Sequence, residues 1–413
     1  MIQSLPGFRD FLPADCAVRN YMFNTWREVS RRYGFEEYDG PVLEDLELFK
    51  KKSGEEIVKQ LYNFTDKGGR AIALRPEMTP TLARMVAAAH RDFRKPIKWF
   101  CIPQMFRYER PQRGRLREHY QYNCDIIGEA SVDADIELIA VCIDVLRAFG
   151  FTADDVVVRI SDREFWIDFL RTQNITEERW QSVLEVIDKT EREPREKSAE
   201  RLGGLADRVF HILDHGGASQ KLQSIVEGLQ QRGLGDFVRV DLRIVRGLAY
   251  YTGVVFEAFD RAGKLRAIAG GGRYDNLVAH LSDGAASLPA LGFAMGDVVV
   301  RELIRENAPA RAKMEQAIAR EQKLDVYVVI AKEERRDSAL AQIQALRDQN
   351  YRVEYPLTPA KVGKQFQTAE HLNADFAILY GDEWPQVKVK RLATREEQLV
   401  AHEELLAHLA RSS

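Results

Sequence analysis

Cysteine is scarce in this sequence, and no stretch of it stays apolar for long. The four cysteines show neither C-x-x-C spacing nor nearby histidines, a pattern that argues against zinc ligands and disulfides and favours buried, reduced thiols. The best apolar run, 138–146, is interrupted by Asp144 and falls short of the roughly 18 residues of a membrane helix. We therefore expect neither a disulfide framework nor a membrane span. The four cysteines are Cys16, Cys101, Cys124 and Cys142.

Targeting signals, metal motifs and an excess of one charge are also missing. Segment 1–13 lacks the cationic and apolar parts of a secretion signal, so we expect a cytoplasmic protein. None of the eight histidines lies in an H-E-x-x-H pattern, which leaves any metal site unknown. The chain has 60 Lys and Arg against 63 Asp and Glu, a net charge of −3. Bulk charge therefore cannot hold it on nucleic acid, and any basic surface must be local.

The length of 413 residues suggests two or three domains at roughly 150 residues each. We predict a first domain over 1–320 and a second over 324–413. Within the first, strand patterns vanish and charge rises over about 164–235, which indicates a mainly helical insertion. In the second, strands and helices alternate, which predicts a small α/β domain with a largely parallel sheet.

Hydrophobic periodicity and the glycines that end helices predict the individual elements. Helices are expected over 15–33 and 132–149, each followed by a glycine, and over 336–349 and 361–371. The triplet 270–272, all glycine, is expected to break the chain before a further helix. Strands are expected over 97–102, 120–127, 156–160, 238–244, 254–259, 265–269, 325–330, 351–355, 376–380 and 387–392.

The densest chemical signal is the arginine-rich segment 106–128. Five arginines and one acid, Glu109, fall between positions 107 and 117, and Pro111 and Gly114 favour a turn there. Planar guanidinium groups suit phosphate oxygens, so this loop could clamp a polyanion. A solvated charged hairpin fits the same composition. The five arginines are Arg107, Arg110, Arg113, Arg115 and Arg117.

The strand after this loop alternates polar and apolar residues. A period of two puts Gln121, Asn123 and Asp125 on one face and Tyr120, Tyr122, Cys124 and Ile126 on the other. Amide and carboxylate groups beside an arginine loop favour a lined pocket over an exposed polar face, although the exposed face stays possible.

A second polar signal lies at 74–80. Pro76 and Pro80 prevent a helix through this stretch, so Glu77 and Thr79 are expected on a fixed turn, where the carboxylate could receive an ammonium group. The same residues also fit a helix start, with Thr79 as N-cap and Pro80 at the first helical position. Both interpretations can hold together.

Two glycine-containing segments complete the set. In 246–253, Arg246 precedes a glycine and Tyr250 and Tyr251 lie between two glycines, and these three side chains could line a cleft. In 269–275, three glycines before Arg273 and Tyr274 permit close approach of backbone to a ligand or another strand. The G-x-G-x-x-G spacing of a dinucleotide site is absent.

Taken together, these segments resemble the histidyl-tRNA synthetases, a branch of the class II aminoacyl-tRNA synthetases. The resemblance covers nearly the whole chain, from G-F-R-D at 7–10 through the Pro41 region, the arginine-rich loop (class II motif 2), R-G-L-A-Y-Y-T-G and G-G-R-Y-D. It continues into K-V-G-K-Q-F at 361–366, which resembles the family's anticodon-binding domain.

The resemblance implies an α+β fold: a catalytic domain on a mixed, mainly antiparallel sheet, the helical insertion, and a C-terminal α/β anticodon-binding domain. It implies a homodimer formed partly through the Pro41 segment. The implied reaction activates L-histidine with ATP and transfers it to tRNA(His), with Mg²⁺ expected.

Site roles follow from the resemblance residue by residue. Glu77 and Thr79 would hold the histidine, with Glu77 facing its ammonium group. Arg107 and Arg246 would be catalytic residues at the α-phosphate of ATP, and Glu109 would lie beside the adenine. The remaining matches are Gln121, Asp125, Tyr250, Tyr251 and Tyr274 around the histidine, and Arg115 near the tRNA acceptor end.

Three positions depart from the family pattern. Asp125 is one methylene shorter than the usual glutamate, and Ala249 stands where aspartate is common. Val299 occupies the position of the motif 3 arginine that holds the γ-phosphate, and Arg301 lies about 200° further around a helix. The sequence leaves open how the γ-phosphate is held.

Two other functions are alternatives to the synthetase. One is a non-catalytic paralogue such as the regulatory subunit of ATP phosphoribosyltransferase, a class that typically lacks the anticodon-binding domain and the arginine of R-G-L-x-Y-Y-T-G. The other is a tRNA-binding protein without activity, which rests on Val299. The presence of Glu77, Arg107, Arg246 and the C-terminal domain favours the enzyme.

Overall fold

The computed structural model describes residues 2–53, 55–110, 114–217, 219–245 and 250–412. It divides into two compact units, Met1–Met314 and Glu315–Ser413. No helix in the described ranges is both long enough and apolar enough to pass through a bilayer.

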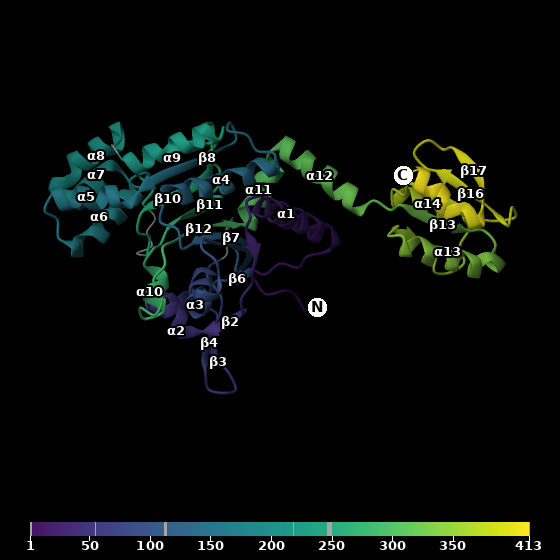
Figure 1. The fold of residues 1–413 in the computed structure, drawn as a ribbon, viewed down its shortest axis with the longest axis horizontal. Helices are drawn as coiled ribbons and strands as arrows, with labels where there is room; N and C mark the ends of the chain where they lie inside the picture. The colour runs from purple at the N-terminus through teal and green to yellow at the C-terminus, as the bar shows by residue number, and fades with distance from the viewer. Residues whose placement is uncertain (1, 54, 111–113, 218, 246–249, 413) are drawn as a thin grey trace. The chain divides into compact units, whose positions relative to one another are not determined.

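A large sheet is the frame of the first unit (Figure 1). Its nine described strands follow the order β1-β5-β7-β12-β11-β10-β8-β9, with β6 paired to β7. Pairing is antiparallel from β5 to β8 and parallel at the edges β1–β5 and β8–β9, so the mainly antiparallel sheet is confirmed. The strands are β1 Glu36–Glu37, β5 Ile97–Cys101, β6 Gln104–Phe106, β7 Glu118–Ile127, β8 Val156–Asp162, β9 Val238–Val240, β10 Val254–Asp260, β11 Ala269–Arg273 and β12 Ala290–Gly296.

Helices α1 (Pro13–Arg32) and α4 (Val132–Phe149) pack on this sheet close to their predicted positions. Gly150 follows α4 with φ of 105°, a conformation that ends a helix without steric cost. Trp26 of α1 stacks on Tyr122 of β7 at 5.6 Å between ring centroids. The remaining elements are the small sheet β2 (Leu43–Asp45), β4 (Ala71–Leu74) and β3 (Asn63–Thr65), and the helices α2 Leu46–Ser53, α3 Thr79–Ala89, α10 Leu277–Leu281, α11 Asp297–Glu306 and α12 Ala308–Gln322.

The segment between β8 and β9, expected to be mainly helical, forms a group of helices that Figure 1 shows in teal. Asp162 holds both of its ends, because its carboxylate accepts from Glu164 N at the start of α5 and from Ser219 Oγ at the start of α9. The helices are α5 Arg163–Thr172, α6 Glu177–Lys189, α7 Arg195–Leu202, α8 Ala206–His215 and α9 Gln220–Gln231.

The prediction for 265–272 is wrong, because β11 runs through the glycine triplet and does not stop before it. β11 lies between β10 and β12, and its neighbours approach closely. A Cβ at Gly271 would lie 2.3 Å from the Gly292 carbonyl oxygen, and one at Gly272 would lie 2.6 Å from that of Val254. The glycines therefore make a central strand possible. β9 is shorter than predicted, since the chain turns at Asp241.

The second unit has a five-stranded sheet, ordered β14-β13-β15-β16-β17, with α13 (Arg336–Asp348), α14 (Val362–His371) and α15 (Leu405–Ser412). The prediction of a largely parallel sheet is correct for β14, β13 and β15, which pair in parallel. It is wrong for β16 and for β17, a strand that we did not predict, because both pair antiparallel. The strands are β13 Val326–Ile330, β14 Val353–Glu354, β15 Phe376–Tyr380, β16 Gln386–Arg391 and β17 Glu397–Ala401.

Gln365, from the K-V-G-K-Q-F segment, is buried in this unit. Its side chain accepts from Ile330 N at 2.8 Å and donates to Ile330 O at 2.9 Å. The amide thus ties α14 to the end of β13, where it satisfies backbone groups.

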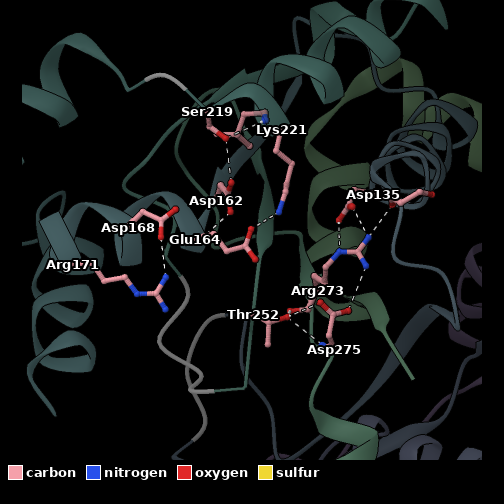
Figure 2. A network of polar contacts seen from close by, with 12 residues as sticks. Asp135, Asp162, Glu164, Asp168, Arg171, Ser219, Lys221, Thr252, Arg273 and Asp275 are labelled. Atoms are coloured by element: carbon pink, nitrogen blue, oxygen red, sulfur yellow. Dashed lines mark hydrogen bonds and ion pairs between the residues drawn. The ribbon is translucent and has the colours of Figure 1, made fainter. Parts of the chain in front are cut away.

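A buried ion pair fixes β11 against α4 (Figure 2). Arg273 Nη2 lies 2.5 Å from Asp135 Oδ2, and the two side chains are 7% and 4% exposed. The same guanidinium donates to the backbone carbonyls of Glu129 and Ser131. Asp275, also beside Arg273, accepts from Ala290 N and Thr252 Oγ1.

We expect Arg273→Met to lower the free energy of unfolding by about 3–5 kcal/mol, because it leaves Asp135 buried without its cation. Urea unfolding of the full chain, followed by tryptophan fluorescence, measures this. The control is Arg171→Met, which breaks an exposed pair with Asp168 in the same figure and should change stability by less than about 1 kcal/mol. Equal effects of the two variants would contradict the importance of the buried pair.

Candidate active site

Two adjoining cavities open over the strands β7, β11 and β12. The larger has a volume of about 780 Å³ and the smaller about 110 Å³. Four residues line both cavities, so ligands bound in the two would meet at this shared wall. The four are Arg107, Gln121, Gly270 and Ala294.

One face of β7 runs through both cavities. Gln121, Asn123 and Asp125 all line the smaller one, on the single face that the period of two predicts. His119, two residues earlier on the same face, lines the larger one. The polar face of this strand is therefore a pocket wall and not an exposed surface.

Asp125 carries a buried carboxyl group in the smaller cavity. It is 5% exposed, and Tyr274 donates its hydroxyl to Oδ1 at 2.5 Å. Burial raises the pKa of Asp125 to about 7, while the hydrogen bond from Tyr274 opposes that rise. Gly292 faces Asp125 on β12, and a Cβ there would lie 1.8 Å from Oδ1. The glycine therefore makes the space that this carboxyl group occupies.

Glu77 and Thr79 enter the smaller cavity from the start of α3. The N-cap of this helix is Met78, so the prediction that Thr79 caps it is wrong; Thr79 is its first residue and lines the cavity. Glu77 pairs with Lys52 of α2, whose side chain is 1% exposed. The Lys52 ammonium also lies 4.1 Å from the centroid of the Tyr250 ring.

Three tyrosines form an aromatic side of the smaller cavity. The rings of Tyr250 and Tyr251 are 4.5 Å apart between centroids, and those of Tyr250 and Tyr274 are 6.1 Å apart. Tyr251 and Tyr274 are 7% and 3% exposed. The cavity thus combines aromatic surface, two carboxyl groups and two side-chain amides, which suits a small ligand with a cationic group and a polar ring.

The larger cavity is strongly basic. Four guanidinium groups line it, and Glu257 is the one carboxylate among its described lining residues. Burial, together with the positive charges of Arg107, Arg9 and Arg115, lowers the pKa of His119 to about 3, so its imidazole is neutral at physiological pH. Such a cavity suits a polyanion with an uncharged ring. The four arginines are Arg107, Arg115, Arg192 and Arg266.

The G-F-R-D segment holds two walls of the larger cavity together. Arg9 pairs with Glu118 of β7 at 2.6 Å and with Asp297 of α11 at 2.8 Å. Asp297 also accepts from Tyr120 N at 3.0 Å. Arg9 is therefore a positioning residue, since it fixes the start of α11 beside β7.

One described residue of the predicted site is absent from this lining, and another predicted site residue lies outside the described ranges. Glu109 lines neither cavity, and its carboxylate pairs with Arg115 at 2.5 Å. Arg246 lies outside the described residues. Arg107 is well placed, with Nε donating to the Pro76 carbonyl at 3.0 Å, and Arg115 lies at the larger cavity with its side chain 44% exposed.

Sequence reasoning missed four residues that the fold brings to the cavities. His119 could have been found, because it continues the alternation of Gln121 and Asn123 by one step. Lys52, Arg192 and Arg266 carry no local signal, since they come from a helix, the helical insertion and a turn that approach the site only in the folded chain.

Comparisons with known proteins follow the same division of the chain. The family model described as Histidyl-tRNA synthetase matches residues 7–298, and that described as Anticodon binding domain matches residues 325–411. The chain is 45% identical to a histidine–tRNA ligase from Opitutus terrae, over 98% of this chain and 97% of that protein. It is 39% identical to the chloroplastic/mitochondrial histidine–tRNA ligase of Arabidopsis thaliana, over 95% and 83%.

The fold has a solved counterpart as well. The crystal structure of histidyl-tRNA synthetase from Nostoc sp. PCC 7120 superposes with a TM-score of 0.80 at 23% identity and covers all of both chains. The full-length relatives, the two matched family models and the class II sheet lead to one conclusion: the chain belongs to the histidyl-tRNA synthetase family of class II aminoacyl-tRNA synthetases.

Proposed function

We propose that this chain is a histidine–tRNA ligase that binds L-histidine in the smaller cavity and ATP in the larger. The observation that carries the proposal is the wall that the two cavities share, with Arg107 between an acidic, aromatic pocket and a basic one. The near full-length similarity to curated ligases, including the anticodon-binding region, favours this function over a non-catalytic paralogue.

Histidine presents an ammonium, a carboxylate and an imidazole. We assign the ammonium to Glu77 with Thr79 nearby, and the imidazole to Asp125, Gln121 and the tyrosines Tyr250, Tyr251 and Tyr274. Imidazole needs one donor and one acceptor partner. A pocket that supplies both can reject apolar analogues by roughly 10⁴-fold or more, since its own buried polar groups would be left unpaired.

The first step joins the histidine carboxylate to the α-phosphorus of ATP and releases pyrophosphate. Negative charge grows on the α-phosphate oxygens, and Arg107, at the shared wall, stabilises it electrostatically. Arg246 is assigned to the same phosphate from the sequence resemblance alone. No side-chain nucleophile is needed, because the substrate supplies the attacking carboxylate. A ribose hydroxyl of the tRNA then takes the histidyl group, and AMP leaves.

Magnesium belongs with the nucleotide in this proposal. Among the described residues, no group of three or more His, Cys, Asp or Glu side chains is arranged to hold a metal ion. Mg²⁺ usually binds through one or two carboxylates and the substrate phosphates. Glu257 is therefore the residue that would meet it, where the ion would neutralise phosphate charge. Glu109 is assigned to the adenine from the resemblance alone.

The macromolecular partners follow from the other parts of the chain. The C-terminal unit is assigned to the anticodon of tRNA(His), and Arg115 to the acceptor end. A homodimer through the Pro41 segment is supported by Val42 and Leu43, apolar side chains that are 44% and 43% exposed there. The four cysteines are free thiols, which fits the cytoplasm.

The proposed function predicts histidine-dependent exchange of labelled pyrophosphate into ATP by the full chain. The other amino acids should support no exchange above background, because they cannot pair with the imidazole-specific groups of the smaller cavity. Exchange that requires no amino acid, or that prefers a different one, would contradict the assignment.

Glu77→Gln should raise the KM for histidine by about 10- to 100-fold, since a charged hydrogen bond to the ammonium is worth about 1.5–3 kcal/mol. The measurement is pyrophosphate exchange at varied histidine and saturating ATP. Glu47→Gln is the matched control, because Glu47 lies on α2 with its side chain 73% exposed and should leave the KM unchanged. An unchanged KM in the Glu77 variant would refute its role.

Asp125→Asn should flatten the pH dependence of stability. The folded pKa of Asp125 is raised to about 7, so this carboxyl group stabilises the folded chain at low pH and loses that contribution as pH rises to 7. The free energy of unfolding of the variant, relative to that of the wild type, should therefore rise by up to about 1.4 kcal/mol per pH unit between about pH 4 and 7. Urea unfolding across this range tests it, and parallel profiles of the two proteins would contradict it.

A further inference from the structure

The wall of the larger cavity formed by α11 is aliphatic. Val298 and Val299, in the first turn of this helix, line the cavity and bring no positive charge to it. The next arginine along the helix, Arg301, lies outside the lining and pairs with Asp15 at 2.6 Å. A phosphate group against this wall must therefore take its cation from another element.

Arg266 comes to the same wall from the turn between β10 and β11. A Cβ atom built on the Gly114 backbone would lie 3.8 Å from Arg266 Cδ and 3.8 Å from Val299 Cγ2. The stem of Arg266 and the side chain of Val299 thus converge beside the arginine-rich loop. Arg266 lines the larger cavity and does not line the smaller one.

The guanidinium of Arg266 is available for a ligand. Arg107 donates to the Pro76 carbonyl, and Arg115 pairs with Glu109. Arg266, by contrast, has no hydrogen bond or ion pair within the described part of the chain. Water can solvate this exposed guanidinium, but four guanidinium groups around one cavity make a positive region that attracts a polyanion.

We infer that Arg266 binds the terminal phosphates of ATP, in the place where Val299 offers no charge. The inference rests on the proposed function, because it takes ATP as the ligand of the larger cavity. Arg107, at the shared wall, meets the α-phosphate next to the histidine. The pyrophosphate part then extends into the larger cavity away from the histidine, where a planar fork of donors can bind its oxygens.

Arg192 is a second arginine of this cavity, supplied by the helical insertion. Its side chain is not within 4 Å of a Cβ built on Gly114, whereas those of Arg266 and Val299 are, and for that reason Arg266 is assigned to the terminal phosphates. If Arg192 had this role, removal of Arg266 would leave ATP binding unchanged.

The first test is Arg266→Ala in the full chain, measured by histidine-dependent pyrophosphate exchange. We expect the KM for ATP to rise by about 10- to 100-fold, the loss of a charged hydrogen bond, and the KM for histidine to stay within about twofold. Inhibition by AMP, which lacks the terminal phosphates, should also stay within about twofold. Lys264→Ala is the matched control. Lys264 carries the same charge as Arg266 and lies two residues before it, but its side chain does not line the cavity.

The second test moves the charge from the β10–β11 turn to α11 on the same wall. Adding Val299→Arg to Arg266→Ala should recover at least part of the ATP affinity, because it returns a guanidinium to the region beside Gly114 that the Arg266 stem approaches. Arg266→Lys should lie between wild type and Arg266→Ala, because lysine keeps the charge and loses the fork.

Three outcomes would overturn the inference: an unchanged KM for ATP in Arg266→Ala, an equal loss of AMP and ATP affinity, or an equal effect of Lys264→Ala. Each of these outcomes differs from a failure of the proposed function. If the proposed function were wrong, the wild-type chain itself would not exchange pyrophosphate with histidine.

Discussion

The ion pair between Arg273 and Asp135 is the constraint on which the rest of the site depends. It fixes the end of β11 to the buried helix α4, and β11 supplies a common wall of both cavities at Gly270. The next residue, Tyr274, then reaches Asp125 across the sheet. The arginine of the G-G-R-Y-D segment thus attaches β11 to α4, and its tyrosine lines the smaller cavity.

The sheet places two recognition chemistries side by side on one strand. Along β7, His119 and Gln121 face the basic cavity, and Gln121, Asn123 and Asp125 face the acidic one. A displacement of β7 would therefore disturb both cavities together. Arg9 restrains β7 against such a displacement, since it pairs with Glu118 on β7 and with Asp297 on α11.

Local pattern was sufficient for some of these features. The alternation at 120–127 identified the pocket face of β7, and capping signals located α1 and α4 closely. Local pattern failed where the structure of a segment depends on the strands beside it. Three glycines can end a strand or allow a central one, and only the approach of β10 and β12 distinguishes the two. Arg266 and Val299 both lie close to Gly114 although they are far apart in the chain, so no local pattern predicts this arrangement.

Lys52 gives the smaller cavity an internal counter-ion. Its ammonium sits against Glu77 and over the Tyr250 ring, the surroundings that we assign to the ammonium of the substrate. Binding would then be an ion exchange, in which the incoming amine replaces a resident one and the carboxylate never stands uncompensated in a region of low dielectric. Such competition would lower the affinity for the incoming amine, because the Lys52–Glu77 pair must separate before the new pair can form.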